Sequence, residues 1–179
     1  SKCRAATEVD HRSRTDALPM CWVVRLAGDQ PDEVRRAVDG IIARHGRIDV
    51  WINNAGIYPR QAADEITMAE WRRMLDTNLD GAWRCCEAII PQLKRQQSGA
   101  IINVGSIVLR LGMAQLTHYL ASKGGLGGMT RGLARDLGKY HVRGNCGHLG
   151  AVLAEGAVRL FPDQAARRRR DRRRVGWGE

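Results

Sequence analysis

The chain has 179 residues, 44% of them hydrophobic, and a formal net charge of +10 at pH 7. This length gives room for one domain with a substantial core, and no apolar run approaches the roughly 18 residues that a membrane-spanning helix needs. The first residues lack the basic and then apolar pattern of a secretory signal, so we expect a cytoplasmic protein without a membrane partner.

The cysteines and histidines argue against a disulfide-stabilised protein and against a metal-binding protein. Five cysteines, an odd number without a C-x-x-C spacing, favour reduced thiols over a disulfide framework. The five histidines show no ligand spacing, and the sequence therefore predicts no metal site.

Most of the positive charge lies near the C-terminus. The stretch from Arg167 to Arg174 holds seven arginines and one aspartate, a net +6 of the total +10. A run of like charges is usually solvated, and the rest of the chain has no basic surface interleaved with aromatic residues. We therefore predict a disordered Arg-rich tail over residues 161–179 and argue against nucleic acid as the main partner.

The chain begins with a polar stretch that has no clear period, and residues 1–22 are expected to be irregular. Residues 22–26 include a short candidate strand. Residues 29–33, with a proline among acidic residues, are typical of a helix start. The helix that follows is predicted to end at Gly46 and to bury an apolar stripe of Val34, Val38, Ile41 and Ile42.

Residues 48–52 form the next predicted strand, which leads into Asn-Asn-Ala-Gly at positions 53–56. In an open parallel sheet, ligands bind beyond the carboxyl ends of the strands. A glycine there lets a flat ligand approach the backbone, and asparagine side chains can bridge neighbouring strands. The same residues also suit an ordinary turn, and the tetrapeptide alone favours that interpretation.

A capping box over residues 67–70 predicts a long helix that runs to about residue 96 or 97. Asn78 lies inside this mostly apolar helix, where a buried asparagine needs hydrogen-bond partners. A satisfied core asparagine is the alternative to a functional one. The apolar run at residues 100–105 then predicts a strand buried on both faces, with Ser106 at its end.

The residues from 106 to 123 contain a hydroxyl followed by a Tyr-x-x-x-Lys pair, Tyr119 and Lys123. Residues four apart share one face of a helix, and a neighbouring ammonium favours the phenolate form of a tyrosine. Such a tyrosine can pass a proton to or from an alcohol oxygen. Taken alone, the pair is more often a surface contact.

A further short strand is predicted over residues 141–145.

The alternation of strands and helices predicts an α/β fold, a Rossmann-like doubly wound parallel sheet. The chain resembles the classical short-chain dehydrogenase/reductase family over about residues 32–150. The resemblance rests on Asn-Asn-Ala-Gly at 53–56, on Thr77-Asn78, on Ser106 at a strand end and on the Tyr-x-x-x-Lys pair. On this basis residues 23–160 are expected to form a partial domain of that type.

The resemblance implies an oxidoreductase that uses NAD or NADP to interconvert a small-molecule carbonyl and its alcohol. Tyr119 would be the general acid or base, and Lys123 would tune it and hold the nicotinamide ribose. Ser106 would bind the substrate oxygen, and Asn78 would hold a water in a proton relay. The residues implied to line the cofactor site are Asn53, Ala55, Gly56, Tyr119 and Lys123.

The sequence also departs from the family at both ends. The glycine-rich turn that binds the cofactor pyrophosphate in the family has no counterpart here, because Gly28 is the only glycine among residues 1–30. We therefore expect an N-terminally incomplete sheet with an apolar, unpaired edge at residues 48–52. The alternative function is a catalytically inactive fragment or an association-only member of the family. The full-length parent is expected to be a homo-oligomer.

Overall fold

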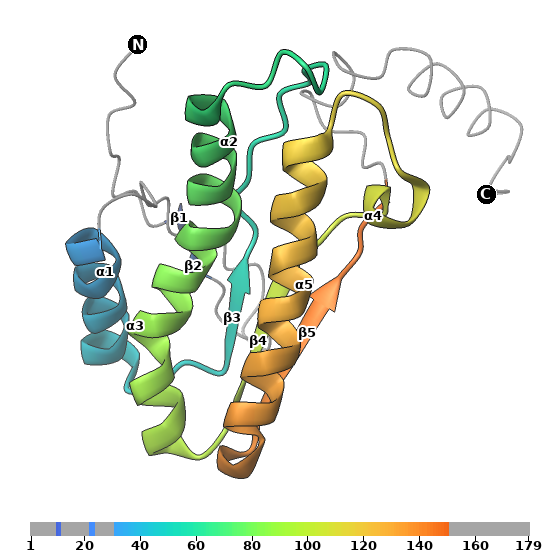
Figure 1. Ribbon diagram of the computed structural model, residues 1–179. Helices are drawn as coiled ribbons and strands as arrows, with labels where there is room; N and C mark the ends of the chain where they lie inside the picture. The colour runs from blue at the N-terminus through green and yellow to red at the C-terminus, as the bar shows by residue number, and fades with distance from the viewer. Residues whose placement is uncertain (1–9, 12–21, 24–30, 151–179) are drawn as a thin grey trace, which may run out of the picture. The chain divides into compact units, whose positions relative to one another are not determined.

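The computed structural model describes residues 10–11, 22–23 and 31–150 (Figure 1). Three parallel strands, β3 (Val50–Asn53), β4 (Gly99–Val104) and β5 (Val142–Gly147), are accompanied by the helices α1 (Pro31–His45), α2 (Met68–Leu75), α3 (Gly81–Gln96), α4 (Val108–Leu111) and α5 (Thr117–Leu137). A π-helical turn, η1 (Asp76–Asp80), joins α2 to α3, and a 3-10 turn, η2 (Gly138–Tyr140), follows α5. These elements belong to one compact unit.

The strand order is β3-β4-β5, and both pairings are parallel. Trp51 lies opposite Ile101, and Ile101 lies opposite Gly144. A Cβ added to Gly144 would lie 3.1 Å from the carbonyl oxygen of Thr130 in α5, so glycine lets this helix pack closely on the sheet. The predicted parallel α/β arrangement is confirmed, with strand bounds within two residues of those expected from sequence.

Within the described residues, β3 pairs only with β4. Alternate residues of a strand point to opposite faces, so Val50 and Ile52 share one face of the sheet. Val50 is 49% exposed and Ile52 is 55% exposed. Trp51 and Asn53 alternate with them and are less exposed. In the described part of the sheet, the segment expected to be an apolar edge therefore has solvent-exposed aliphatic side chains.

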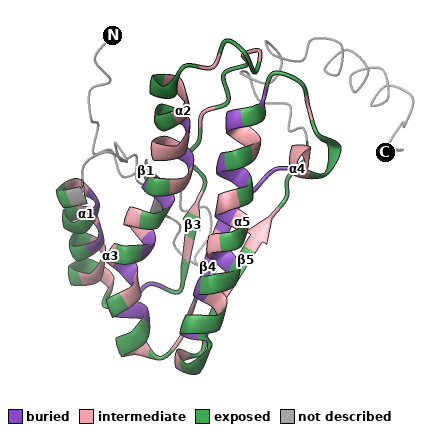
Figure 2. Ribbon diagram, viewed as in Figure 1, coloured by how far each residue is buried: buried purple, intermediate pink, exposed green. Residues whose placement is uncertain are grey.

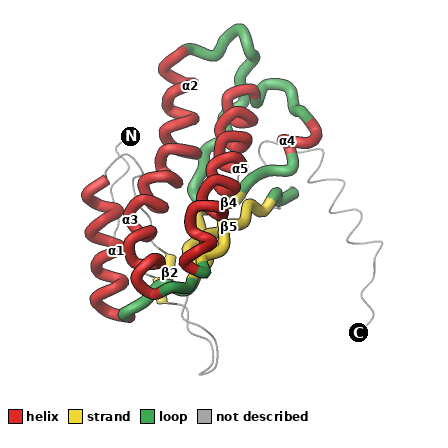
Figure 3. Tube along the Cα trace, turned by 60° about the horizontal axis from the view of Figure 1, so that its bottom comes forward, coloured by secondary structure: helices red, strands yellow, loops and turns green. Residues whose placement is uncertain are grey.

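Helices α1, α3 and α5 lie side by side in one layer along the sheet of β3, β4 and β5, and the short helix α4 lies outside this layer (Figure 3). Their inward sides carry most of the buried residues, as the purple segments of α3 and α5 show (Figure 2). The main apolar core lies between these helices and the sheet and consists of Val38, Ile48, Cys86, Ile89, Leu93, Ile101, Leu133, Leu137 and Val142. No helix in the described ranges combines the length and the hydropathy needed to cross a membrane.

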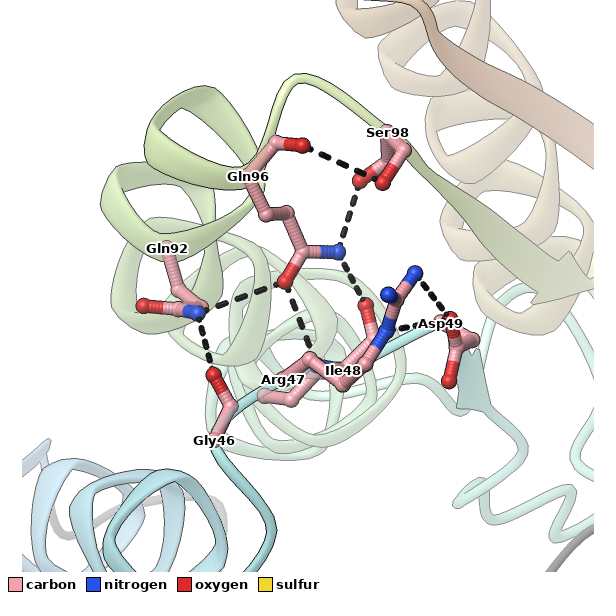
Figure 4. A network of polar contacts seen from close by, with 7 residues as sticks. All are labelled: Gly46, Arg47, Ile48, Asp49, Gln92, Gln96 and Ser98. Atoms are coloured by element: carbon pink, nitrogen blue, oxygen red, sulfur yellow. Dashed lines mark hydrogen bonds and ion pairs between the residues drawn. The ribbon is translucent and has the colours of Figure 1, made fainter.

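Helix α1 begins at Pro31, has Asp32 and Glu33 in its first turn and ends before Gly46, as predicted. Gly46 has a φ of +74°, a left-handed conformation that favours glycine at a helix end. A polar cluster then fixes the start of the next segment (Figure 4). The amide of Gln96 donates to the Ile48 carbonyl oxygen at 2.6 Å and accepts from the Ile48 N–H at 3.2 Å, so the end of α3 holds the chain that enters β3.

The long helix expected after residue 67 is present in three parts, α2, η1 and α3. The capping box is confirmed, because Thr67 Oγ1 accepts from the Glu70 N–H at 3.2 Å and Glu70 Oε2 accepts from the Thr67 N–H at 3.0 Å. The π-helical turn was not predicted. A π turn inserts extra backbone into a helix and is common at functional sites, and here it carries Asn78.

Two short strands, β1 (Asp10–His11) and β2 (Trp22–Val23), form an antiparallel pair, and β1 lies in the range expected to be irregular. Two residues are too few to give a periodic pattern, so the sequence did not indicate β1. Strand β2 occupies the start of the candidate strand at 22–26, whose other residues lie outside the described ones. The predicted Arg-rich tail at 161–179 also lies outside the described residues.

Candidate functional site

The carboxyl ends of β3 and β4 bring four sequence-predicted segments together. Lys123 Nζ, from α5, donates to the carbonyl oxygen of Val104, the last residue of β4, at 2.7 Å. A Cβ placed on Gly56 would lie 3.5 Å from Lys123 Nζ and 3.3 Å from Asn78 Oδ1. The Asn-Asn-Ala-Gly loop, η1, β4 and α5 therefore meet around one glycine, and only a residue without a side chain leaves space there.

Lys123 is the only charged residue among the buried ones in the described ranges, with 4% of its surface exposed. Burial lowers the pKa of its ammonium, and the nearby Cys146 acts in the opposite direction. Its Nζ lies 5.8 Å from the centroid of the Tyr119 ring, so the predicted shared face of the helix is present. An ammonium has three donors, and one of them is used by Val104.

Tyr119 is half-buried, and its ring contacts a second tyrosine, Tyr58, which no motif in the sequence indicated. The rings of Tyr58 and Tyr119 are 6.4 Å apart in an edge-to-face arrangement with an interplanar angle of 70°. Tyr58 follows the Asn-Asn-Ala-Gly loop by two residues and is 37% exposed. Its proximity to the loop in sequence was the available signal, but an aromatic residue after a turn predicts no particular contact.

Asn78 is 1% exposed, and both ends of its amide are bonded. Oδ1 accepts from the Ile57 N–H at 2.8 Å, while Nδ2 donates to the Ile57 carbonyl oxygen at 2.9 Å and to Ser122 Oγ at 3.1 Å. The asparagine is thus a satisfied buried residue, as one interpretation of the sequence required. It also ties the loop after β3 to α5, beside Gly56 and Lys123.

Asn53 has its side chain in the layer between sheet and helices. Its Nδ2 donates to Asn103 Oδ1 on β4 at 2.8 Å, and its Oδ1 accepts from Trp51 Nε1 at 2.7 Å. Asn53 thus bridges neighbouring strands, which the sequence allowed but did not favour over an ordinary turn. With the side chain engaged in this way, the part of Asn53 that remains for a ligand is its backbone.

Asn103 and Thr130 extend that bridge and were missed from sequence. Asn103 is fully buried and donates from Nδ2 to Thr130 Oγ1 at 2.8 Å. An asparagine inside an apolar strand was the available signal, because a buried amide requires partners. The network joins β3, β4 and α5 into one unit beneath the site.

Ser106 comes directly after Val104 and Gly105, at the predicted strand end, and is 9% exposed. Its Oγ accepts from the Val108 N–H at 3.4 Å, at the start of the short helix α4, which the sequence did not indicate. Gly105 donates its N–H to the Gly147 carbonyl oxygen at 2.8 Å, so the parallel pairing continues up to the serine.

His118 precedes Tyr119 and is completely buried, and neither of its ring nitrogens has a hydrogen-bond partner. Burial lowers the pKa of its imidazole, while the carboxylate of Glu70 acts in the opposite direction. Among the described residues, no group of three or more His, Cys, Asp or Glu side chains could hold a metal ion.

The short chain dehydrogenase family model matches residues 5–165. The 3-oxoacyl-[acyl-carrier-protein] reductase FabG of Staphylococcus epidermidis is 36% identical over 132 residues, which cover 74% of this chain and 54% of that protein. The D-xylose 1-dehydrogenase of Caulobacter vibrioides is 39% identical over 110 residues, which cover 62% of this chain and 44% of that protein. The chain thus spans about half the length of the curated relatives it matches.

Solved structures give the same result for the fold. A gluconate 5-dehydrogenase from Burkholderia cenocepacia J2315, in complex with NADP and tartrate, superposes with a TM-score of 0.73 at 30% identity, over 79% of this chain and 55% of that chain. ElxO with NADP bound gives a TM-score of 0.72 at 24% identity, over 78% of this chain and 57% of that chain. These superpositions confirm the Rossmann-like α/β class predicted from sequence.

Proposed function

Because the chain belongs to the short chain dehydrogenase family, we propose that the protein is an NAD(P)-dependent oxidoreductase that interconverts a carbonyl and an alcohol. The observation that carries the proposal is the buried Lys123 ammonium at the carboxyl ends of the strands, beside Gly56, Asn78 and Tyr119. A buried charge costs stability, and ionisable groups held in such surroundings cluster at functional sites. The relative with NADP in its structure supports the same cofactor class.

The residues around Lys123 fit a nicotinamide cofactor, which supplies or accepts the hydride when it is bound. Gly56 leaves space next to the ammonium, because a side chain there would approach both Lys123 Nζ and Asn78 Oδ1. The two ammonium donors not directed at Val104 suit the two hydroxyls of a ribose. The backbone of Asn53 and Ala55 completes the proposed lining of the cofactor site.

Tyr119 has the proton-transfer role in this proposal. Its phenol donates a proton to the substrate oxygen during reduction and accepts one during oxidation. The Ser106 hydroxyl donates a hydrogen bond to the same oxygen and stabilises the charge that develops on it. Asn78 holds a water near Lys123, through which protons exchange with solvent.

A titration of the full chain with NADH and with NADPH, followed by nicotinamide fluorescence, tests the cofactor site. We expect saturable but weak binding, because residues 1–30 lack a glycine-rich phosphate turn. Lys123→Ala should weaken it further. The matched control is Lys139→Ala, at an exposed lysine in η2 beyond the other end of α5, which should bind as the parent does. No saturable signal, or equal binding by all three proteins, would favour the association-only alternative.

A further inference from the structure

One hydroxyl links the proposed general acid to the loop that follows β3. Ser122 lies in α5 between Tyr119 and Lys123 and is completely buried. Its Oγ donates to the Tyr119 carbonyl oxygen at 2.7 Å and accepts from Asn78 Nδ2 at 3.1 Å. A hydroxyl has a single donor, so its hydrogen is used on the backbone of Tyr119 itself.

The other end of this link is the loop beside Gly56. The Asn78 amide makes two bonds to the backbone of Ile57, one through each of its polar atoms, at 2.8 and 2.9 Å. A continuous series of bonds therefore runs from Ile57 through Asn78 and Ser122 to Tyr119. This series joins three segments that are far apart in the sequence. Asn78 lies in the π-helical turn η1, and a regular α-helix would direct the side chain of residue 78 differently.

A second hydroxyl on the same helix shows what a bond of this type does elsewhere. Thr130 Oγ1 accepts from Asn103 Nδ2 at 2.8 Å and donates to the Leu126 carbonyl oxygen at 2.7 Å. The chemistry is that of Ser122, but the helix carbonyl belongs to a leucine in the core. Loss of the Thr130 hydroxyl should therefore affect packing and leave Tyr119 in place.

We propose that Ser122 is a positioning residue for Tyr119, whose hydroxyl sets the first turn of α5 against Asn78 and the loop after β3. The proposal rests on the proposed function for its catalytic consequence. Without the hydroxyl, the Asn78 amide and the Tyr119 carbonyl each lose a partner, and the turn that carries the phenol can shift. A misplacement of about 1 Å can reduce turnover about 100-fold.

The first test measures the position of Tyr119 without requiring activity. The chain has three tyrosines, at positions 58, 119 and 140, so NMR of the full chain labelled with ¹³Cζ-tyrosine gives three assignable signals. In Ser122→Ala, the Tyr119 signal should shift or broaden, while Tyr140, in η2, stays unchanged. Thr130→Val removes the comparable hydroxyl and should leave the Tyr119 signal at its parental position.

Conservative variants separate the hydroxyl from simple packing. Ser122→Thr keeps the hydroxyl and should restore the parental Tyr119 signal. Where the added methyl prevents folding, Ser122→Cys, with a weaker donor of similar size, should give a signal between those of the parent and Ser122→Ala. An unchanged Tyr119 signal in Ser122→Ala, or an equal change in Thr130→Val, would overturn the proposal.

The kinetic test separates positioning from binding. Ser122→Ala should lower kcat by about 10- to 100-fold and leave the dissociation constant of NADH at the parental value. An equal loss in both would mean that the site as a whole had collapsed, contradicting a positioning role. If the NMR change is present but the parent chain neither binds NADH nor turns over, the proposed function fails and the coupling of Ser122 to Tyr119 stands.

Discussion

The two halves of helix α5 bury different kinds of side chain. The half that begins at Thr117 buries His118, Ser122 and Lys123, whereas the half that ends at Leu137 buries leucines and Thr130. Each half contains one hydroxyl bonded to an asparagine, so hydrogen bonding alone does not distinguish them. What differs is that the first half also buries the Lys123 ammonium, which has one hydrogen bond to Val104, and the His118 imidazole, which has none. Burial of either group costs stability.

This difference agrees with the proposed function, which assigns the chemistry to the half that begins at Thr117. Polar groups buried at a net cost are common where function, and not packing, selects the residue. The second half follows the pattern of an ordinary core helix, with apolar residues packed against β4 and β5.

The largest effect is expected at Tyr119. Tyr119→Phe removes the transferable proton and keeps the ring, so turnover should fall by about 100- to 10,000-fold while NADH affinity stays at the parental value. Steady-state kinetics and the fluorescence titration measure the two quantities. Tyr140→Phe, beyond the other end of the helix, is the control and should keep parental turnover. Near-parental turnover of Tyr119→Phe would contradict its assignment as the general acid.

The second half should respond in stability instead. Leu133 is 7% exposed and belongs to the main core, so Leu133→Ala should lower the free energy of unfolding by about 2–5 kcal/mol. Urea denaturation followed by circular dichroism measures this loss. Cofactor affinity, compared under conditions where the variant is folded, should be parental. A variant with parental stability would show that the leucine is not part of a close-packed core.

Lys123→Met should lower function without lowering stability. Loss of the ammonium removes the proposed ribose contact, so NADH affinity and turnover should both fall. The free energy of unfolding should be unchanged or higher, because an apolar side chain of similar length no longer carries the desolvation cost of a buried charge. A clear loss of stability in urea would mean that the bond from Lys123 to Val104 outweighs that cost, and that the lysine is retained for structure.

Much of this arrangement follows from the sequence. The family membership and the Rossmann-like class were expected from ordered motifs, and the capping box at Thr67 gave the start of α2 within one residue. Parallel strands have their carboxyl ends at the same end of the sheet, so Ser106 and the loop at 53–56 were expected to lie near each other at that end. Residues four apart on a helix placed Lys123 on the face of Tyr119.

Other features have no local pattern. The π turn at residues 76–80 adds a single residue to a helical repeat, which an apolar period does not detect. The bond between Asn78 and Ser122 joins residues 44 apart, and the Asn53–Asn103–Thr130 network likewise depends on which elements pack together. The contacts of Asn78, Ser122 and Asn103 therefore required tertiary structure, although their amide and hydroxyl groups were visible in the sequence.

The smallest effect is expected from His118, and it depends on pH. Burial holds the pKa of this imidazole below its usual value, whereas in the unfolded chain the pKa is about 6.5. At pH values well above 6.5, His118 is neutral in both the folded and the unfolded chain. As the pH falls through this value, the unfolded chain binds a proton that the folded chain does not bind, and stability must decrease until the pH reaches the lowered pKa of the folded state.

The loss due to His118 cannot exceed about 1.4 kcal/mol per pH unit. Urea denaturation at about pH 7.5, 6.5 and 5.5 should show a decline for the parent that is smaller in His118→Leu. His141→Asn, at an exposed residue with a φ of +58° that asparagine tolerates, is the control and should decline as the parent does. Hydrogen bonds from Thr67 lower the pKa of the Glu70 carboxyl, so Glu70 has its own pH-dependent contribution to stability. That contribution is lost only near and below the unfolded-state pKa of about 4.3, which is more acidic than the pH values used here. A parent as dependent on pH as His118→Leu would mean that His118 is protonated equally in the folded and unfolded chains, and that its burial has no cost that function needs to explain.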